Sequence, residues 1–195
     1  MKKIVLLVIA VLMSTTINAQ KKKFSKEVKS SPVIAKVDNL VAEVKSGNFQ
    51  ITINENGKAK DAIIIKTVDA KFAPKDSKLV AFTANGIKLY LLSWTEITQN
   101  KTELKTEDIT TIYSNVYEVT SKKLVLYNTQ LTNHIVEKVF LDKLKNASET
   151  QEKMRREGFE FTLNADGSVT QKNKTQVNKL VYDVTKMEYV NAKKK

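Results

Sequence analysis

Apolar and polar residues alternate with a period of two through most of the chain after residue 48. Phe49, Ile51 and Ile53 begin this alternation. Further strand-like runs occupy residues 62–68, 79–83, 87–97, 109–119, 123–131, 134–141, 159–163, 168–172, 177–184 and 187–190. Short runs separated by turn residues at regular intervals are typical of antiparallel sheets. The pattern predicts a mainly β protein, with a single antiparallel β-sandwich or barrel-like domain over residues 32–190.

The glycines support this assignment, because each of the five lies where the chain is expected to reverse or stop. Three of them form the dipeptides Asn56-Gly57, Asn85-Gly86 and Asp166-Gly167. Asn-Gly and Asp-Gly supply the positive φ angles that tight hairpin turns require. We therefore expect β-hairpins centred on these three dipeptides.

The segment 149–157 departs from the strand pattern. Ser148 and Gln151 have the spacing of a capping box, and acidic residues lie near the start of the segment. Arg155 and Arg156 lie near its end, where positive charge suits a helix dipole. These features predict one short surface helix that connects two β regions.

The segment 32–45 is compatible with two structures. Its apolar residues fit one face of a helix, with Ser31 as a cap, Pro32 at the first position and Gly47 beyond the end. The segment is also rich in valine, and Leu40, Ala42 and Val44 alternate as in a strand. The capping residues favour an amino-terminal helix, and the strand remains the alternative.

The first 19 residues have the order of a secretory signal peptide. Lys2 and Lys3 precede the apolar run 4–13, and Ala19 provides a small residue at the expected cleavage point. The run is shorter than the roughly 20 residues that span a bilayer. Residues 20–31 then form a basic leader that we expect to be disordered, and residues 191–195 form a basic tail. We predict an exported protein, periplasmic or secreted, with no transmembrane segment in the mature chain.

Composition narrows the possible partners. The chain contains no cysteine, which excludes disulfides and a lipid-anchored amino terminus. The formal net charge is +12, yet Arg155 and Arg156 are the only arginines. Export and the scarcity of arginine argue against nucleic acid as a partner. The lysine clusters 21–23 and 193–195 either associate weakly with anionic envelope surfaces or serve solubility alone.

The sequence contains no recognisable reaction centre. His134 is the only histidine and lies in a strand pattern, so we expect a partly exposed surface residue and no transition-metal site. Residues 164–167 resemble part of a calcium loop, but the flanking ligand positions are wrong, which favours a turn. Glu107 and Asp108 are the only adjacent acidic pair, in a polar stretch 99–108 that we expect to be a loop. Phosphate and dinucleotide glycine motifs are absent. We therefore assign no catalytic, cofactor or metal residue.

Two aromatic residues offer a different kind of candidate. Tyr90 and Trp94 are four apart in a strand pattern, so they share a face with Leu92 and Glu96. Leu89 and its odd-numbered neighbours lie on the opposite face, which predicts a central strand with apolar groups on both sides. Core packing is the favoured role of Trp94, and the lining of a ligand cavity is the alternative.

The sequence as a whole favours an exported envelope protein with a non-enzymatic binding or structural role. The first alternative is a carrier or sensor of a small apolar ligand held in a β-barrel or sandwich cavity. A hydrolase that uses a pair of carboxylates is a distant third possibility, because 21 acidic residues always allow such a pair.

Overall fold

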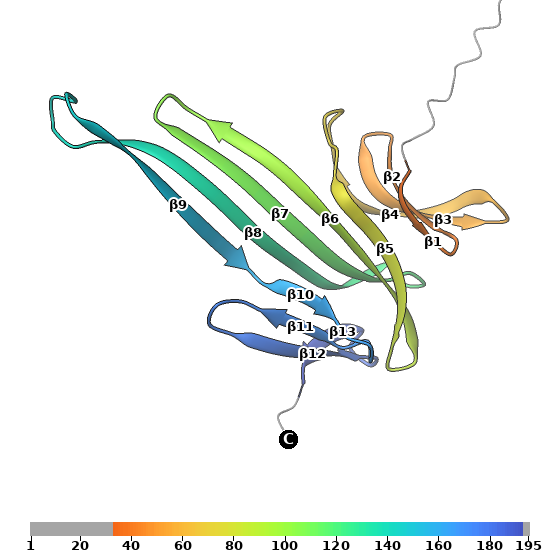
Figure 1. The fold of residues 1–195 in the computed structure, drawn as a ribbon. Helices are drawn as coiled ribbons and strands as arrows, with labels where there is room; N and C mark the ends of the chain where they lie inside the picture. The colour runs from red at the N-terminus through yellow and green to blue at the C-terminus, as the bar shows by residue number, and fades with distance from the viewer. Residues whose placement is uncertain (1–32, 193–195) are drawn as a thin grey trace, which may run out of the picture. The chain divides into compact units, whose positions relative to one another are not determined.

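The computed structural model describes residues 33–192, and this part of the chain forms β-strands and no helix (Figure 1). The strands form three sheets in which neighbours follow one another along the sequence. All neighbouring strands pair antiparallel, and the prediction of a mainly antiparallel β fold is therefore confirmed. The expected signal peptide 1–19, the leader 20–31 and the last three residues of the basic tail lie outside the described residues.

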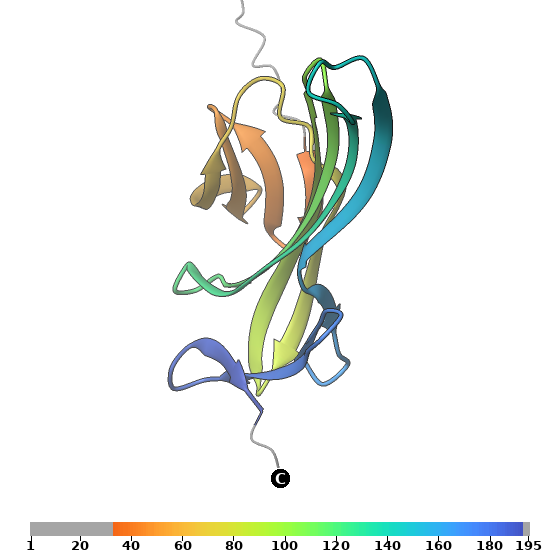
Figure 2. The ribbon, with the colours of Figure 1, turned by 90° about the vertical axis from the view of Figure 1, so that its left-hand side faces the viewer.

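Sheet A and sheet B contain the first nine strands. Sheet A consists of β1 (Val33–Val37), β2 (Leu40–Lys45), β3 (Asn48–Glu55) and β4 (Lys58–Thr67). Sheet B consists of β5 (Lys75–Ala84), β6 (Ile87–Lys101), β7 (Lys105–Glu118), β8 (Lys123–Phe140) and β9 (Ser148–Gly158). The three inner strands of sheet B, β6, β7 and β8, are longer than any strand of sheet A (Figure 2).

Sheet C contains the last four strands, which are shorter. They are β10 (Glu160–Leu163), β11 (Val169–Lys172), β12 (Val177–Asp183) and β13 (Glu188–Asn191). The described residues include no helix that is long and apolar enough to cross a membrane.

The predicted helix at 149–157 is wrong, because this segment is strand β9. It pairs with β8 in unbroken register from Phe140 opposite Ser148 to Gln130 opposite Gly158. Capping spacing and terminal charges act over one or two helical turns, whereas this ladder engages eleven consecutive residues. The long partner strand therefore outweighs the local preference.

The helix favoured at 32–45 is also wrong, and the strand alternative holds. The chain forms β1 and β2, which reverse after Val37 through Asp38 with a φ of 50°. Leu40 and Ala42 are fully buried, in keeping with their alternation. Pairing of β2 with β3 satisfies the backbone along the whole of β2.

Two breaks expected in sheet B do not occur. Residues 123–131 and 134–141 were expected as separate strands, but β8 continues through Thr132 and Asn133. The polar stretch 99–108 is not a loop either, because β6 extends to Lys101 and β7 begins at Lys105. Polar residues here continue a ladder whose two faces are both accessible to water, so they do not mark turns.

The two faces of sheet B pack against different partners. The Trp94 face carries Tyr90, Leu92 and Trp94, which form one core with Leu40 and Phe49 of sheet A. The opposite Leu89 face forms a second core with sheet C. That core contains Ala84, Leu89, Val116, Val125 and Tyr182, with Phe161 and Tyr189 packed against it.

Candidate functional site

An apolar groove lies on the Trp94 face, between β4 at the outer edge of sheet A and strands β7 and β8 of sheet B. Its volume is about 430 Å³. We call it the aromatic groove. Its apolar lining includes Ile64 from β4, Trp94 from β6, Tyr113 and Tyr117 from β7, and Leu124 and Tyr127 from β8.

Three of these side chains are open to solvent. Ile64 is 63% exposed, Tyr127 is 56% exposed and Leu124 is 43% exposed. Ile63 and Ile65 pack into the core between sheets A and B, so Ile64 between them points to the opposite face of β4. Sheet A ends at β4, and the apolar side chains of β8 that line the groove are exposed. Exposed apolar side chains gathered around a concavity are typical of a binding surface.

The deep wall of the groove is a stack of aromatic rings. Trp94 lies parallel to Tyr113 with ring centroids 4.6 Å apart, and it meets Phe49 edge-on at 5.2 Å. Trp94 is only 2% exposed. The predicted packing role of Trp94 is therefore confirmed, and the same indole also contributes to the groove.

Lys66 and Glu96 anchor this wall between the two sheets. Lys66 Nζ lies 2.5 Å from Glu96 Oε1 and 4.6 Å from the ring centroid of Phe72. Trp94 Nε1 donates a hydrogen bond to the same carboxylate oxygen at 2.6 Å. One carboxylate of β6 therefore satisfies both the indole of the core and a lysine of β4.

Asn115 is the one neutral amide among the residues that line the groove. It is 3% exposed and lies between Tyr113 and Tyr117 on the Trp94 face. Its Nδ2 donates to the hydroxyl oxygen of Tyr117 at 3.3 Å. Its Oδ1 is buried and accepts no hydrogen bond from any described residue. Burial raises the pKa of Tyr117 above its usual value, so this hydroxyl remains a neutral partner.

An ion pair engages one of the lysines that line the groove. Lys122, in the turn between β7 and β8, pairs with Asp61 of β4. The hydrogen bond from Lys122 and one from the backbone of Ala62 hold the pKa of Asp61 below its usual value. Lys66 and Lys122 are the charged residues that line the groove, and each is matched by a carboxylate.

Another hollow, of about 680 Å³, lies where the turn between β5 and β6 approaches β12 and β13. Glu118 lines it and is 8% exposed. Its carboxylate accepts hydrogen bonds from the backbone nitrogens of Thr120 at 3.0 Å and Ser121 at 2.6 Å. Burial opposes ionisation, but the hydrogen bonds from Ser121 and Thr120 prevail and lower the pKa of Glu118. This carboxylate therefore serves the turn after β7.

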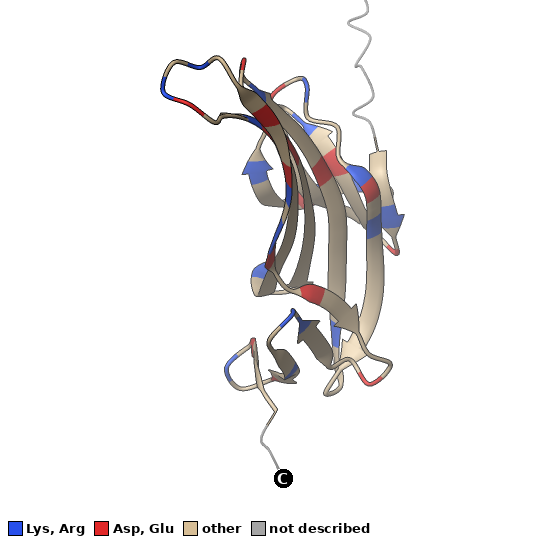
Figure 3. Ribbon diagram, turned by 60° about the vertical axis from the view of Figure 1, so that its left-hand side comes forward, with Lys and Arg blue, Asp and Glu red and all other residues tan. Residues whose placement is uncertain are grey.

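Beyond the two cores, sheet B carries charges of both signs. From Ile97 to Lys101 every residue of β6 is exposed, and β9 is exposed along nearly its whole length. Basic and acidic positions are interspersed on sheet B and do not form one patch of single sign (Figure 3).

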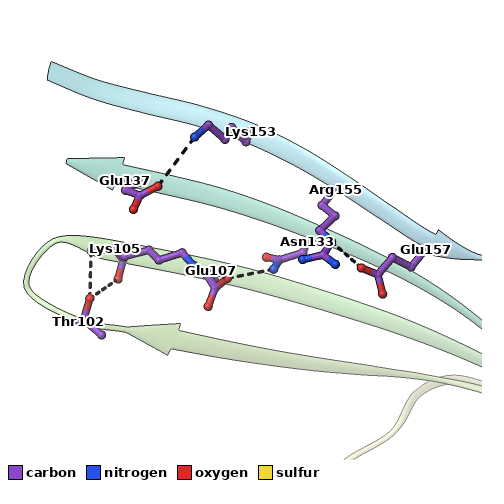
Figure 4. A network of polar contacts seen from close by, with 8 residues as sticks. All are labelled: Thr102, Lys105, Glu107, Asn133, Glu137, Lys153, Arg155 and Glu157. Carbon is purple, nitrogen blue, oxygen red and sulfur yellow. Dashed lines mark hydrogen bonds and ion pairs between the residues drawn. The ribbon is translucent and has the colours of Figure 1, made fainter. Parts of the chain in front are cut away.

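A polar array crosses this region on the Trp94 face (Figure 4). Glu107 Oε1 lies 2.9 Å from Lys105 Nζ and accepts a hydrogen bond from Asn133 Nδ2 at 3.2 Å. The contacts with Lys105 and Asn133 lower the pKa of Glu107. Arg155 pairs with Glu157 at 2.5 Å on β9. Asn133 is 8% exposed, and its Oδ1 also has no partner among the described residues.

The residues singled out from the sequence do not come together into a reaction centre. The side chain of His134 is 39% exposed on β8, as expected for a surface residue, with Nε2 3.6 Å from Glu152 Oε2. Glu107 and Asp108 lie on opposite faces of β7, where Asp108 accepts from Gln99 at 2.6 Å. No group of His, Asp and Glu side chains among the described residues has a geometry that would hold a metal ion.

The calcium-like segment is a turn, as expected. Asp166 Oδ1 accepts hydrogen bonds from the backbone nitrogen of Ser168 at 2.9 Å and from its hydroxyl at 2.5 Å. These bonds, the side-chain one first, lower the pKa of Asp166. The carboxylate that would have been a ligand is engaged within its own turn.

The groove residues Asn115, Leu124 and Tyr127 were not identified from the sequence. Tyr127 and Leu124 belong to an ordinary alternating strand pattern, and only the limited width of sheet A leaves them uncovered. The one local signal in this part of β7 is Asn115, a polar residue that shares a strand face with Tyr113 and Tyr117.

Comparison with known proteins yields no relative. No protein-family model matches this chain, and no curated protein and no solved structure matches it either.

Proposed function

We propose that this is an exported protein of the cell envelope that acts by binding and not by catalysis. The aromatic groove is the observation that carries the proposal, because it gathers exposed apolar side chains at a concave site between two sheets. Ligand sites are commonly concave and apolar with a few polar groups, and Asn115 is such a group here. The signal-like order of residues 1–19 supports export.

A sandwich-like arrangement of the sheets accounts for this site. Sheets A and B share the core around Phe49 and Trp94, as two facing sheets do. Sheet A has four strands and sheet B has five. A narrower sheet packed on a wider one leaves part of the wider face uncovered, and the groove borders that part.

The engagement of the carboxylates supports a role without catalysis. Glu118 and Asp166 bind the backbone of their own turns, and Glu96 binds Trp94 and Lys66. A carboxylate pair of the glycosidase type needs two groups free to exchange protons with a substrate. A hydrolase role therefore has less support here than a binding role.

The test is recovery of the native ligand. The full chain is expressed with its own signal peptide, residues 1–19, and the mature protein is isolated from the cell envelope. Native mass spectrometry then shows whether an apolar molecule co-purifies with it. The Leu124→Glu variant should lose that molecule, because it places a charge in the groove. The Val177→Glu variant is the control, because Val177 is 64% exposed on β12 and does not line the groove. If both variants lose the molecule, or if neither does, the aromatic groove is not its binding site.

We also propose weak association with anionic envelope surfaces through the lysine clusters 21–23 and 193–195. Each lysine near an anionic membrane contributes about 1 kcal/mol. The mixed charges of the described strands support a contribution from the termini more than from the sheets. Sedimentation with anionic vesicles at low salt should be lost at about 0.5 M salt, where screening acts within a few ångströms. Deletion of residues 20–23 and 193–195 should weaken it without changing the β fold. Failure to sediment at low salt would leave these lysines with a solubility role.

A further inference from the structure

The polar groups of the aromatic groove indicate what kind of molecule would fit it. Its volume of about 430 Å³ falls within the range of small-molecule sites. Leu124 and Tyr127 form an accessible rim, and Tyr113 and Trp94 form an apolar wall. A site of this composition favours a ligand with an apolar body.

The charged residues at the groove are already neutralised. Lys122 pairs with Asp61, and Lys66 pairs with Glu96 at 2.5 Å while also contacting the ring of Phe72. An anionic ligand would compete with these carboxylates, and a cationic ligand would meet the lysines. Both would lose charge–charge energy in a partly desolvated site. The arrangement therefore favours a neutral ligand.

Asn115 supplies one unmet hydrogen-bond acceptor. The residue is 3% exposed, its Nδ2 is engaged with Tyr117, and its buried Oδ1 has no partner among the described residues. A buried acceptor without a donor costs about 1–3 kcal/mol. Asn115 lines the groove, but this oxygen is itself covered, so a ligand reaches it only when the side chains over it shift. A ligand that then brings a donor to the oxygen recovers the cost of the unmet acceptor, whereas a ligand without a donor does not.

We propose that the aromatic groove binds a small neutral molecule with an apolar body and one hydroxyl group, and that Asn115 Oδ1 accepts the hydrogen bond from that hydroxyl. This inference rests on the proposed binding function and specifies the chemical class of its ligand. The apolar body lies against Tyr113 and Trp94 and covers Leu124 and Tyr127, which the strands of sheet A leave exposed.

The chain contains its own reporter for this site. Trp94 is the only tryptophan of the chain and lines the groove, so its fluorescence should respond to an occupant. The mature protein is titrated with decanol and with decyl methyl ether. The two probes share an apolar chain, but only the alcohol has a donor. Decanol should produce a saturable change, and the ether should bind about tenfold more weakly.

Variants locate the binding site. Leu124→Glu should abolish the response to decanol, and the matched surface change Val177→Glu should leave it intact. Asn115→Ala should reduce the alcohol-to-ether preference to about one, because it removes the acceptor. Asn115→Asp is a second variant of nearly the same shape, in case the alanine variant does not fold. It retains an acceptor and should retain the preference for the alcohol when the carboxyl is protonated at low pH. Circular dichroism and the urea midpoint establish that each variant is folded.

Three results would overturn this inference. They are the absence of a saturable response to decanol by folded protein, equal affinity for alcohol and ether, and unchanged binding by Leu124→Glu. These outcomes are distinguishable from failure of the proposed function. A different molecule that co-purifies and is displaced by Leu124→Glu would preserve the binding role and reject only the neutral hydroxyl-bearing class.

Discussion

Trp94 Nε1 donates a hydrogen bond to Oε1 of Glu96, two residues further along β6, with 2.6 Å between the two atoms. Side chains two apart on a strand point to the same face, so the carboxylate lies beside the indole at the border of the core. Lys66 Nζ reaches the same oxygen from β4 at 2.5 Å. A single acceptor therefore links the inner strand β6 of sheet B to the edge strand β4 of sheet A.

The first prediction concerns this shared acceptor. Glu96→Ala leaves the indole N–H of Trp94 and the ammonium of Lys66 without their partner, so it should lower the free energy of unfolding by about 1–3 kcal/mol. The Glu55→Ala variant is the control, because Glu55 pairs with Lys60 at a site where both side chains are more than half exposed. That variant should cost far less, because an exposed ion pair contributes little to stability. Urea denaturation followed by Trp94 fluorescence measures both, and equal losses would contradict the linking role of Glu96.

The second prediction concerns the turn that contains Gly167. Its φ is +76°, and a Cβ at this position would collide with the backbone oxygen of Thr83 and lie 2.8 Å from the Cα of Ala84. Gly167→Ala therefore meets both backbone strain and a clash. Gly57→Ala is the matched control, because Gly57 has a φ of +75° with no atom near enough to clash.

Strain alone should cost the Gly57→Ala variant about 1–2 kcal/mol. Gly167→Ala should cost at least about 1 kcal/mol more, because the clash forces sheet C away from β5. The two thermal midpoints provide the comparison. Equal midpoints would mean that the backbone at Thr83 moves away from the added Cβ without loss of stability.

The third prediction concerns stability at alkaline pH. The Tyr189 hydroxyl donates to the carbonyl oxygen of Gly167 at 2.8 Å, and burial raises the pKa of Tyr189 well above the ordinary tyrosine value of 10.0. The folded state therefore holds this proton more tightly than the unfolded state. Its contribution to stability is complete below pH 10 and is lost as pH rises from there towards the folded pKa.

Urea midpoints measured from pH 8 to pH 12 should consequently fall above pH 10. Tyr189→Phe should be less stable than the parent at pH 8, because it loses the hydrogen bond to Gly167, and its midpoint should fall less steeply at alkaline pH. Burial also raises the pKa values of Tyr113, Tyr117 and Tyr182, so some decline should remain in the variant. Parallel curves for the two proteins would assign the alkaline loss to those other tyrosines.

The fourth prediction separates a structural from a functional role of Asn133. Its buried Oδ1 has no partner among the described residues, and its Nδ2 donates a hydrogen bond to Glu107. If the role is structural, Asn133→Val should leave the free energy of unfolding unchanged or raise it by up to about 1 kcal/mol. The reason is that valine suits a strand and carries no unsatisfied group. Chemical denaturation measures this change. A stable variant that no longer binds isolated cell envelopes, in a pull-down that retains the parent protein, would assign Asn133 to a binding surface.

The fifth prediction concerns processing. Protein recovered from an expressing cell should begin at Gln20, because Ala19 ends a stretch with the charged, apolar and small-residue order of a signal peptide. Mass spectrometry of the intact chain measures the terminus, with allowance for cyclisation of the new amino-terminal glutamine. A membrane-bound chain that retains Met1 would contradict export by cleavage.

The sequence by itself determined the class of the fold and the position of two of its tightest turns. Asn56 with Gly57 and Asn85 with Gly86 all adopt positive φ, as the hairpin interpretation of these dipeptides requires. Turn chemistry of this kind acts within four residues and needs no distant partner. The two apolar faces of β6 were also predictable, because alternation alone places Leu89 and Trp94 on opposite sides.

Only the tertiary structure decided the identity of β9, the continuity of β8 and the position of the groove. Residues 149–157 carry helix-like caps, yet the unpaired edge of β8 offered a complete ladder to them. Asn133 by itself suggests a break between two strands. Its pairing with Ile109 of β7 and Arg155 of β9 instead continues β8 through this residue. The groove depends on where sheet A ends relative to Leu124 and Tyr127. That position is set by packing between residues far apart in sequence, such as Phe49 and Trp94, which no local pattern records.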